Sequence, residues 1–308
     1  MRKEVKEAID RGIVLRSQVL SDLKYRQRVR LLELLFQDFF IDQHQLLQKW
    51  AALTGQTAQI DTGYIAQFVA SIVTGFPGQG FRGKGDDLVD GSEVKSAANI
   101  SGVDTPRWNH NMGRKSDDDK KKKLGEKTNS EKYLEAPFLF YLLVDRASPK
   151  EKDAPPETRI RAWCVDVQQD QAWRTLVTKY NREKKDSTYN LQLHPPVGYN
   201  DDLVTNNITN LDFTDILLFD YRIAFQSDGS EKHYWNVELS ESAFPIKGRT
   251  KIVENVDRSK QRKTDTTAED LVADIAVLPD RFPGILSKIV EDQLDEVSEQ
   301  EEVKSRKI

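Results

Sequence analysis

Apolar side chains recur at helical spacing through the first part of the chain. Over Ser21–Lys49, leucine and phenylalanine residues follow one another at three- and four-residue intervals, and helical structure is predicted across residues 13–54. A second apolar helix is predicted over Tyr64–Val73, with Asp61 or Thr62 as its N-cap. The glycine and proline residues that follow are expected to end this helix.

Strand patterns dominate the middle of the chain. The continuous apolar run Ala136–Asp145 predicts a buried strand, and Arg159–Val167 alternates between polar and apolar positions as a strand does. Thr188–Pro196 and Asp215–Phe225 predict two further strands. An amphipathic helix, Asp170–Lys184, is predicted between the second and third of these strands.

The remaining segments complete the predicted layout. Residues 98–132 carry no periodic pattern and include a block of aspartates followed by lysines, so a loop is predicted there. Residues 266–301 have a helical pattern. The expected fold class is α/β, with a mixed central sheet flanked by helices. The expected division is a helical portion at 1–60, an α/β core at 61–260 and a helical portion at 261–308.

Composition is typical of a soluble globular protein. Of 308 residues, 38% are hydrophobic and 31% are charged. No apolar run approaches the ~18 residues needed to cross a bilayer, and the N-terminal segment is too charged for a signal peptide. The single cysteine, Cys164, excludes an intramolecular disulfide and a cysteine-based zinc site. These features predict a reducing, cytoplasmic setting without a membrane partner.

The stretch Gly78–Ala97 (GQGFRGKGDDLVDGSEVKSA) carries two competing patterns. Its first half has the glycine and lysine spacing of a phosphate-binding loop, but Gly85 stands where that loop needs a serine or threonine. A helix is predicted before it, where a strand is required, and Asp86 and Asp87 would repel a triphosphate. The second half, two aspartates followed by Glu-Val-Lys, is therefore the more informative pattern.

A short β-hairpin is predicted in this second half. The segments Asp86–Val89 and Ser92–Ala97 flank an Asp-Gly pair, which is a preferred two-residue turn. Side chains alternate along a strand, so Glu93 and Lys95 are expected on one face and Val94 on the other.

The predicted turn also indicates which aspartate joins this face. With a two-residue turn, Leu88 would pair with Glu93 and Asp86 with Lys95, and cross-strand partners share a face. A one-residue bulge would place Asp87 there instead. Asp86 is favoured, and Asp87 remains a candidate.

These residue types suit metal-dependent phosphodiester chemistry. Two carboxylates, Glu93 with Asp86 or Asp87, and the backbone carbonyl of Val94 would form an oxygen-rich site of the kind that Mg²⁺ prefers. The metal would polarise a phosphodiester and activate a water. Lys95 would orient that water or offset developing negative charge.

Neighbouring residues support this hypothesis. The glycine-rich lead-in allows backbone to approach a ligand closely. Arg82 and Lys84 would place positive charge beside the carboxylates, where it can hold a phosphate chain. Gln67 and Ser71, among the few polar residues of the preceding helix, can face the same region.

The pattern resembles that of the PD-(D/E)xK nuclease superfamily. The resemblance maps the family's first metal-binding aspartate to Asp86 or Asp87, its second acidic ligand to Glu93 and its lysine to Lys95. Gly85 replaces the proline that usually precedes the first aspartate. The resemblance implies a restriction-endonuclease-like fold in which this hairpin lies at the centre of a mixed sheet.

Within that superfamily the whole chain is most similar to type II restriction endonucleases, and the MamI-type group is the nearest that we identify. This resemblance implies a prokaryotic homodimer that cuts both strands of a two-fold symmetric site in double-stranded DNA with Mg²⁺. It also implies a possible cognate DNA methyltransferase in the same restriction system.

Candidate DNA contacts lie on three segments. The net charge of −4 argues against non-specific coating of nucleic acid but permits a local basic groove. The segment around Trp108 offers donor and acceptor types that read base edges, although an ordered surface loop anchored by Trp108 is the alternative. The candidate DNA-binding residues are Arg82, Lys84, Arg107, Asn109, His110, Gln192 and His194.

Three functions remain open from the sequence. The favoured one is a Mg²⁺-dependent, site-specific DNA endonuclease. The second is a repair or junction nuclease of the same superfamily. The third is a non-catalytic DNA-binding protein in which the acidic hairpin is incidental.

Overall fold

The structure is a computed structural model. It describes residues 18–78, 87–100, 105–146, 157–187, 190–198, 202–240, 281–282, 284–286 and 289. No helix in this described part is long and apolar enough to span a membrane.

The chain divides into two compact units. The first unit comprises Met1–Ile60, Gln67–Asp90 and Phe244–Ile308, and the second comprises Asp61–Ala66 and Gly91–Ala243. Each unit is described by itself below.

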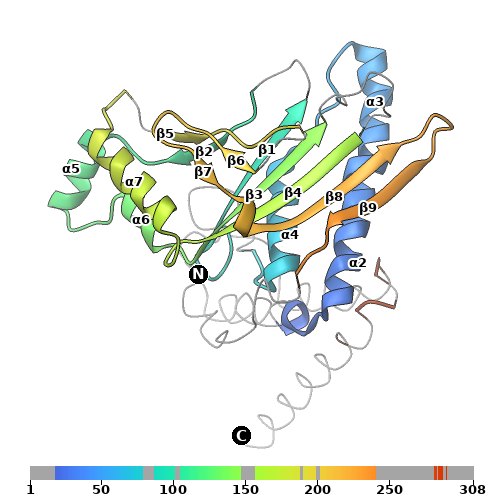
Figure 1. Cartoon of the computed structure of the whole chain (residues 1–308), viewed down its shortest axis with the longest axis horizontal. Helices are drawn as coiled ribbons and strands as arrows, with labels where there is room; N and C mark the ends of the chain where they lie inside the picture. Colours follow the sequence, from blue (N-terminus) through green and yellow to red (C-terminus); the bar gives the residue numbers. More distant parts are fainter. Residues whose placement is uncertain are drawn as a thin grey trace, which may run out of the picture. The chain divides into compact units, whose positions relative to one another are not determined.

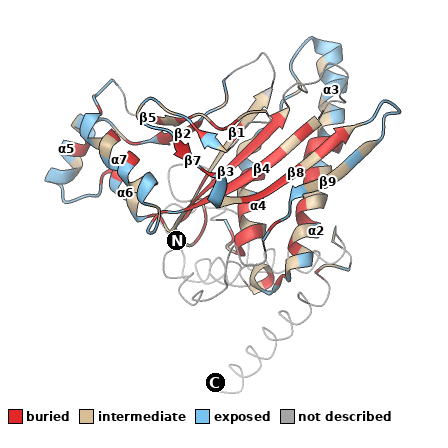
Figure 2. Ribbon diagram, viewed as in Figure 1, coloured by how far each residue is buried: buried red, intermediate tan, exposed pale blue. Residues whose placement is uncertain are grey.

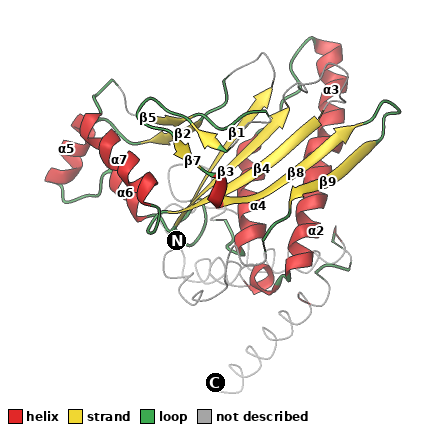
Figure 3. Ribbon diagram, in the orientation of Figure 1, coloured by secondary structure: helices red, strands yellow, loops and turns green. Residues whose placement is uncertain are grey.

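A five-stranded mixed sheet forms the centre of the second unit (Figure 1). In spatial order its strands are β1 (Glu93–Ile100), β3 (Phe138–Arg146), β4 (Glu157–Asp166), β8 (Leu217–Phe225) and β9 (Glu231–Val237). The first two strands pair in parallel, and the other pairs are antiparallel. The mixed α/β fold predicted from the sequence is confirmed, with the sheet and its flanking helices visible in Figure 3.

Two smaller ribbons accompany this sheet. The strands β2 (Trp108–Asn111) and β5 (Asn190–Leu193) form an antiparallel pair, here called the β2–β5 ribbon. The strands β6 (Leu203–Val204) and β7 (Leu211–Asp212) form another, and the short 3₁₀ helix η2 (Thr214–Ile216) leads into β8.

Three α-helices lie entirely within the described residues of the second unit, and two of them have clear start signals. They are α5 (Lys115–Lys123), α6 (Asn129–Glu135) and α7 (Gln171–Glu183), and Figure 1 shows them grouped beside the β2–β5 ribbon. Thr128 and Glu131 form a reciprocal capping box at the start of α6. Asp170 accepts the Trp173 backbone N–H at the start of α7.

The core of the second unit is rich in aromatic side chains and covers one face of the sheet. Trp108 lies 4.7 Å from Tyr141 and 5.6 Å from Trp163 between ring centroids, and its indole N–H donates to the Leu142 carbonyl at 3.0 Å. The strands β3 and β4, which carry Tyr141 and Trp163, are buried along most of their length (Figure 2). Burial of rings this large is the main source of stability here.

The first unit is helical in its described part. It contains α2 (Tyr25–Phe36), the π-helical segment η1 (Gln37–Asp42) and α3 (Gln43–Thr54). The helix α4 (Thr62–Thr74) starts in the second unit and ends in the first. Arg28 is buried and donates to the carbonyls of the residues at 20, 23, 72 and 73, so it satisfies carbonyls at the end of α4.

Most long elements agree with the sequence predictions. The predicted helices are confirmed at α2, α3, α4 and α7, and the predicted long strands at β3, β4 and β8. Asp61 accepts the Gly63 N–H at 2.9 Å at the start of α4. In the predicted strand Thr188–Pro196, the described residues form β5, which ends at Leu193, and residues 188–189 lie outside the described part. The strand β9 was not predicted. Nearly all of the predicted helix at 266–301 lies outside the described residues.

Two local predictions are wrong. Residues 98–132 contain β2, α5 and α6 as well as loops. Among the described residues, 87–89 do not pair with Ser92–Ala97: Leu88 bridges to Gly78, and β1 pairs with β3 alone. The cross-strand pairing from which Asp86 was favoured over Asp87 is therefore not seen in the described part of the chain, and Asp86 itself lies outside it. Within the described sheet β1 is an edge strand, not a central one.

Candidate active site

Glu93 and Lys95 form a close ion pair at the start of β1. The Lys95 ammonium donates to Glu93 Oε2 at 2.6 Å and to the Val94 carbonyl at 3.4 Å. The two side chains are 18% and 19% exposed, while Val94 is buried. The alternation predicted from the sequence therefore holds, with the charged pair on one face of the strand and Val94 on the other.

The strand register places this pair at the rim of the aromatic core. Lys95 pairs with Tyr141 and Glu93 with Leu139, and residues paired across neighbouring strands share a face. Tyr141 and Leu139 are both core residues. The ion pair thus borders an apolar region, where charges interact more strongly than in bulk water.

Aromatic and imidazole groups surround Lys95. Its ammonium lies 5.9 Å from the centre of the Tyr133 ring, within range of a cation–π interaction. The His110 ring packs edge-on against Tyr133 at 5.4 Å, and its Nε2 lies 2.9 Å from the Tyr141 hydroxyl. The positive charge of Lys95 therefore acts on a buried hydrogen-bonded group.

His110 is neutral in this environment. Burial, with a smaller contribution from the charge of Lys95, lowers the pKa of His110 to about 3. Its Nδ1 faces the Leu191 carbonyl at 3.2 Å, so Nδ1 carries the proton and Nε2 accepts from Tyr141. Burial raises the pKa of the Tyr141 hydroxyl well above its ordinary value, which keeps that hydroxyl a donor.

Asp87 is half-buried and held by a side chain from α4. Gln67 Nε2 donates to Asp87 Oδ1 at 2.7 Å, which orients the carboxylate. The sequence indicated that Gln67 and Ser71 can face this region, and Gln67 contacts one of the two candidate aspartates. Asp86, Arg82 and Lys84 lie outside the described residues.

The donor chemistry available at the start of β1 fits a hard divalent cation. Glu93 supplies a carboxylate, and the adjacent Val94 supplies a carbonyl oxygen within reach of the same ammonium. Across the described residues, no three His, Cys, Asp or Glu side chains come together as a complete metal-binding group.

The candidate DNA contacts differ in accessibility. Arg107 and Asn109 are exposed, and Asn109 pairs with half-buried Gln192 across the β2–β5 ribbon. His194 is half-buried, and its Nδ1 has no hydrogen-bond partner in the described part of the chain. Trp108 is fully buried and anchors the segment, as the alternative interpretation predicted.

The prediction that His110 contacts DNA bases is wrong. Its ring is fully buried, and both nitrogens have partners inside the protein. Its position could have been deduced from the sequence Trp-Asn-His-Asn, because strand alternation places His110 on the face of Trp108 and opposite Asn109.

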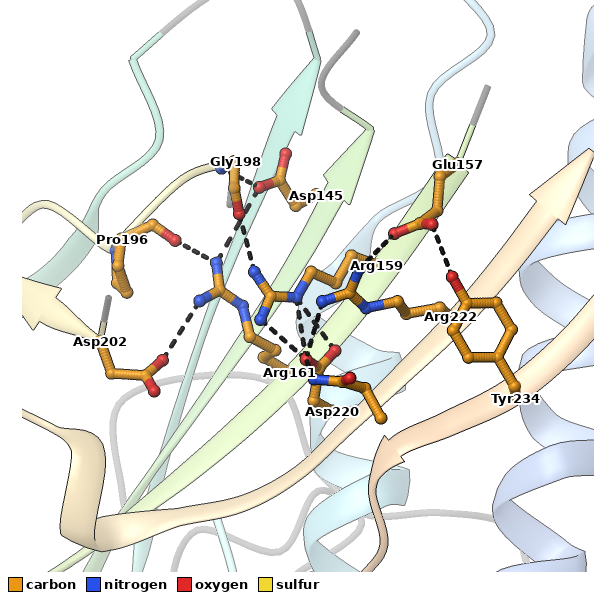
Figure 4. A network of polar contacts seen from close by, with 11 residues as sticks. Asp145, Glu157, Arg159, Arg161, Pro196, Gly198, Asp202, Asp220, Arg222 and Tyr234 are labelled. Carbon is orange, nitrogen blue, oxygen red and sulfur yellow. Dashed lines mark hydrogen bonds and ion pairs between the residues drawn. The ribbon is translucent and has the colours of Figure 1, made fainter. Parts of the chain in front are cut away.

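The strand register places a network of buried and partly buried charges on the same sheet face as Lys95. Figure 4 shows this network, which the sequence analysis did not predict. Asp220 is fully buried and accepts from Arg159 and Arg222. Arg161 is also fully buried, and it pairs with Asp202 at 3.1 Å and donates to the Pro196 carbonyl. The sequence feature that could have predicted this network is the presence of charged residues within otherwise apolar strands. These groups neutralise one another, so the network fixes strands and does not offer an open site.

Comparisons with known proteins show that the chain is similar to restriction enzymes. The family model described as MamI restriction endonuclease matches residues 49–223, a range that includes β1 and the β2–β5 ribbon. The curated protein "Type II restriction enzyme MamI" of Microbacterium ammoniaphilum is 52% identical over 287 residues, which cover 93% of this chain and 92% of that protein. No solved structure gives a significant match.

Proposed function

The chain belongs to the MamI restriction endonuclease family, and we propose that Glu93 and Lys95 form the centre of its active site. The chain is a type II restriction endonuclease, a hydrolase that cleaves DNA at specific sites. The observation that carries the proposed site is the partly exposed Glu93–Lys95 pair, which β1 presents on one face beside a rigid core.

Membership in this family implies a divalent metal ion, and we propose Mg²⁺. Glu93, the Val94 carbonyl and one of Asp86 and Asp87 would hold it. When bound, such an ion polarises the phosphodiester and makes its bound water more acidic. The Lys95 ammonium would orient the attacking water and donate hydrogen bonds to the phosphoryl oxygens as negative charge develops.

Cleavage of plasmid DNA in the presence of Mg²⁺ tests the proposed site. The unmodified protein should give discrete fragments. Lys95→Ala should reduce the cleavage rate by at least a hundredfold, the order expected for loss of a group that stabilises the transition state, while DNA binding in a gel-shift assay stays close to normal. A Lys95→Ala protein that cuts at the normal rate would reject this site.

Lys127→Ala is the matched control. Lys127 makes an ion pair of the same 2.6 Å length with Glu135, but both side chains are more than half exposed. Removal of an exposed pair should leave both folding and cleavage unchanged.

The first acidic ligand is tested by Asp86→Asn and Asp87→Asn. Each substitution keeps the size of the side chain and removes its charge. If the substituted aspartate is the metal ligand, the Mg²⁺ concentration for half-maximal cleavage should rise roughly tenfold or more. The variant of the other aspartate should retain the normal Mg²⁺ dependence. Normal Mg²⁺ dependence in both variants would contradict a ligand from this pair.

We also propose that the enzyme is a homodimer acting on a two-fold symmetric site in double-stranded DNA. A symmetric dimer places one active site on each strand. The exposed apolar residues of α3 support this proposal, because Leu46, Trp50 and Leu53 recur at helical spacing and no residue of α3 is buried. A DNA methyltransferase that protects the same site is the proposed partner within the restriction system.

A further inference from the structure

The outward face of the β2–β5 ribbon carries a group of amide side chains. Asn109 and Asn190 are exposed and Gln192 is half-buried. Asn109 lies directly opposite Gln192 in the antiparallel register, and Asn190 lies two positions from Gln192 on the same face. The inward face holds the buried residues Trp108, His110, Leu191 and Leu193.

These three amides make no hydrogen bond within the described part of the chain, whereas other amides of the second unit do. Asn111 accepts the Gly113 N–H at 3.1 Å, and Asn99 donates to a buried aspartate at 2.7 Å. Asn111 therefore has a structural task, although it shares the outward face. Asn109, Asn190 and Gln192 keep their donors and acceptors for an external partner.

Residues on the inward face of the ribbon attach it to β3. The Trp108 indole donates to the Leu142 carbonyl at 3.0 Å, and His110 contacts the Tyr141 hydroxyl at 2.9 Å. Both contacts join the ribbon to β3. The amides therefore stand on a fixed support, which reduces the entropy lost when they bind a partner.

We propose that the β2–β5 ribbon enters the DNA major groove and that Asn109, Asn190 and Gln192 read adenine bases there. This proposal rests on the proposed function and adds the element that recognises sequence. A two-stranded ribbon fits a major groove about 12 Å wide, and asparagine and glutamine bind adenine through its N6 amino group and N7.

The spacing of the amides fits stacked base pairs. Residues two positions apart on a strand are separated by roughly 6.7 Å. Two base-pair steps along one DNA strand span about 6.8 Å. Asn190 and Gln192 can therefore face base pairs two steps apart, while Asn109 lies across the ribbon from Gln192.

The ribbon and the proposed catalytic pair are close neighbours in the second unit. His110 on the inward face contacts Tyr141, and Tyr141 is the strand neighbour of Lys95. DNA whose backbone reaches Lys95 thus lies near the ribbon. This short connection explains how base reading and phosphodiester cleavage can act on one bound duplex.

The test uses the full-length enzyme and duplexes that contain the site mapped from its own digests. Each adenine is replaced in turn by 7-deazaadenine, which pairs normally but lacks N7. The unmodified enzyme should lose roughly ten- to a hundredfold in kcat/KM at the adenines that the amides contact. Asn109→Ala, Asn190→Ala and Gln192→Ala should each lose a similar factor on the normal site and show no further loss at their own adenine.

Gln171→Ala is the control, because Gln171 is an exposed amide at the start of α7. It should cleave normally and keep the full sensitivity to 7-deazaadenine. Asn109, Asn190 and Gln171 are exposed, and the half-buried Gln192 makes no side-chain hydrogen bond in the described part of the chain, so all four variants should fold.

The outcomes separate the two proposals. If the three ribbon variants cut with normal rate and specificity, or if 7-deazaadenine has no effect at any position, the ribbon does not read adenine. Lys95→Ala should still bind DNA with the same 7-deazaadenine sensitivity as the unmodified enzyme. A Lys95→Ala protein that cuts normally would overturn the proposed active site and leave the ribbon result standing.

Discussion

The sequence predicted the orientation of a site side chain correctly where strand alternation alone determines that orientation. Glu93 and Lys95 share a face because they are two residues apart on a strand. The choice between Asp86 and Asp87 depended on which strand pairs with which, and that pairing is a long-range property. Alternation within β2 also separates buried His110 from exposed Asn109, although this use of the pattern was missed.

His110 should make stability depend on pH. Its folded pKa of about 3 lies below the ordinary value of 6.5, so below pH 6.5 the unfolded chain binds a proton that the folded chain does not. The stabilisation is fully present above pH 6.5 and falls by about 1.4 kcal/mol per pH unit as the pH drops towards 3. Urea unfolding of the unmodified protein from pH 7 to pH 4 measures this slope.

His110→Gln should reduce that slope. Glutamine can donate to the Leu191 carbonyl and accept from Tyr141 without titrating, although its different shape should cost about 1–3 kcal/mol at pH 7. If the variant and the unmodified protein lose stability at equal rates as the pH falls, His110 is not the group responsible.

The sequence predicted strands and helices correctly where the pattern of apolar and polar residues extends over many positions. The strands β3 and β8 have nine residues and are mostly apolar. The strands of the β2–β5 ribbon have only four residues each, and β9 is largely polar. These short or partly exposed strands form through pairing with neighbours, which local sequence does not encode.

The helix α5 shows a second limit of prediction from composition. A block of aspartates followed by lysines indicated a loop, yet the acidic residues occupy the first turn and the lysines the last turn. That order complements the helix dipole. In addition, buried Asp118 pairs with Lys184, which also donates to the Met112 carbonyl at 2.9 Å. The tertiary pair was not visible in the sequence.

The charge network that joins three strands should be sensitive to loss of Asp220. This carboxylate accepts from Arg159 on β4, from Arg222 on its own strand β8 and from Asn236 on β9. Asp220→Asn would leave two partly buried guanidinium groups short of their counter-charge. The free energy of unfolding should fall by about 3–5 kcal/mol. Urea denaturation at pH 7 provides the measurement.

Glu183→Gln is a suitable control, since its ion pair with Arg182 is exposed and its loss should change stability by less than about 0.5 kcal/mol.

Burial alone would raise the pKa of Asp220, but hydrogen bonds and charge from Arg159, with Arg222, lower it overall. The carboxylate thus stabilises the fold above its ordinary pKa and loses that effect as the pH falls through the folded value. An Asp220→Asn protein with an unchanged urea midpoint would contradict this role.

The chain as a whole is acidic, so its affinity for DNA has to come from locally placed groups. Whether copies of the chain assemble is difficult to predict from sequence. The same spacing of apolar residues occurs on a helix that faces a core and on one that faces a partner. On α3 the exposed fractions show that the apolar positions do not face a core within the described part of the chain. Leu46, Trp50 and Leu53 are 56%, 60% and 76% exposed, which leaves a helical stripe of apolar surface.

If this stripe joins two copies, Trp50→Glu combined with Leu53→Glu should convert the dimer to monomer, because each copy would place two charges against an apolar surface. The dimer dissociation constant should rise by at least roughly a hundredfold, as expected for loss of central hot-spot residues, and sedimentation velocity measures it. Gln48→Glu, on the opposite side of α3, should leave the dimer intact. The monomer should also nick plasmid DNA before linearising it, since the two strands would then be cut by independent encounters. A double variant that stays dimeric and linearises plasmid in one step would place the symmetric interface on another surface.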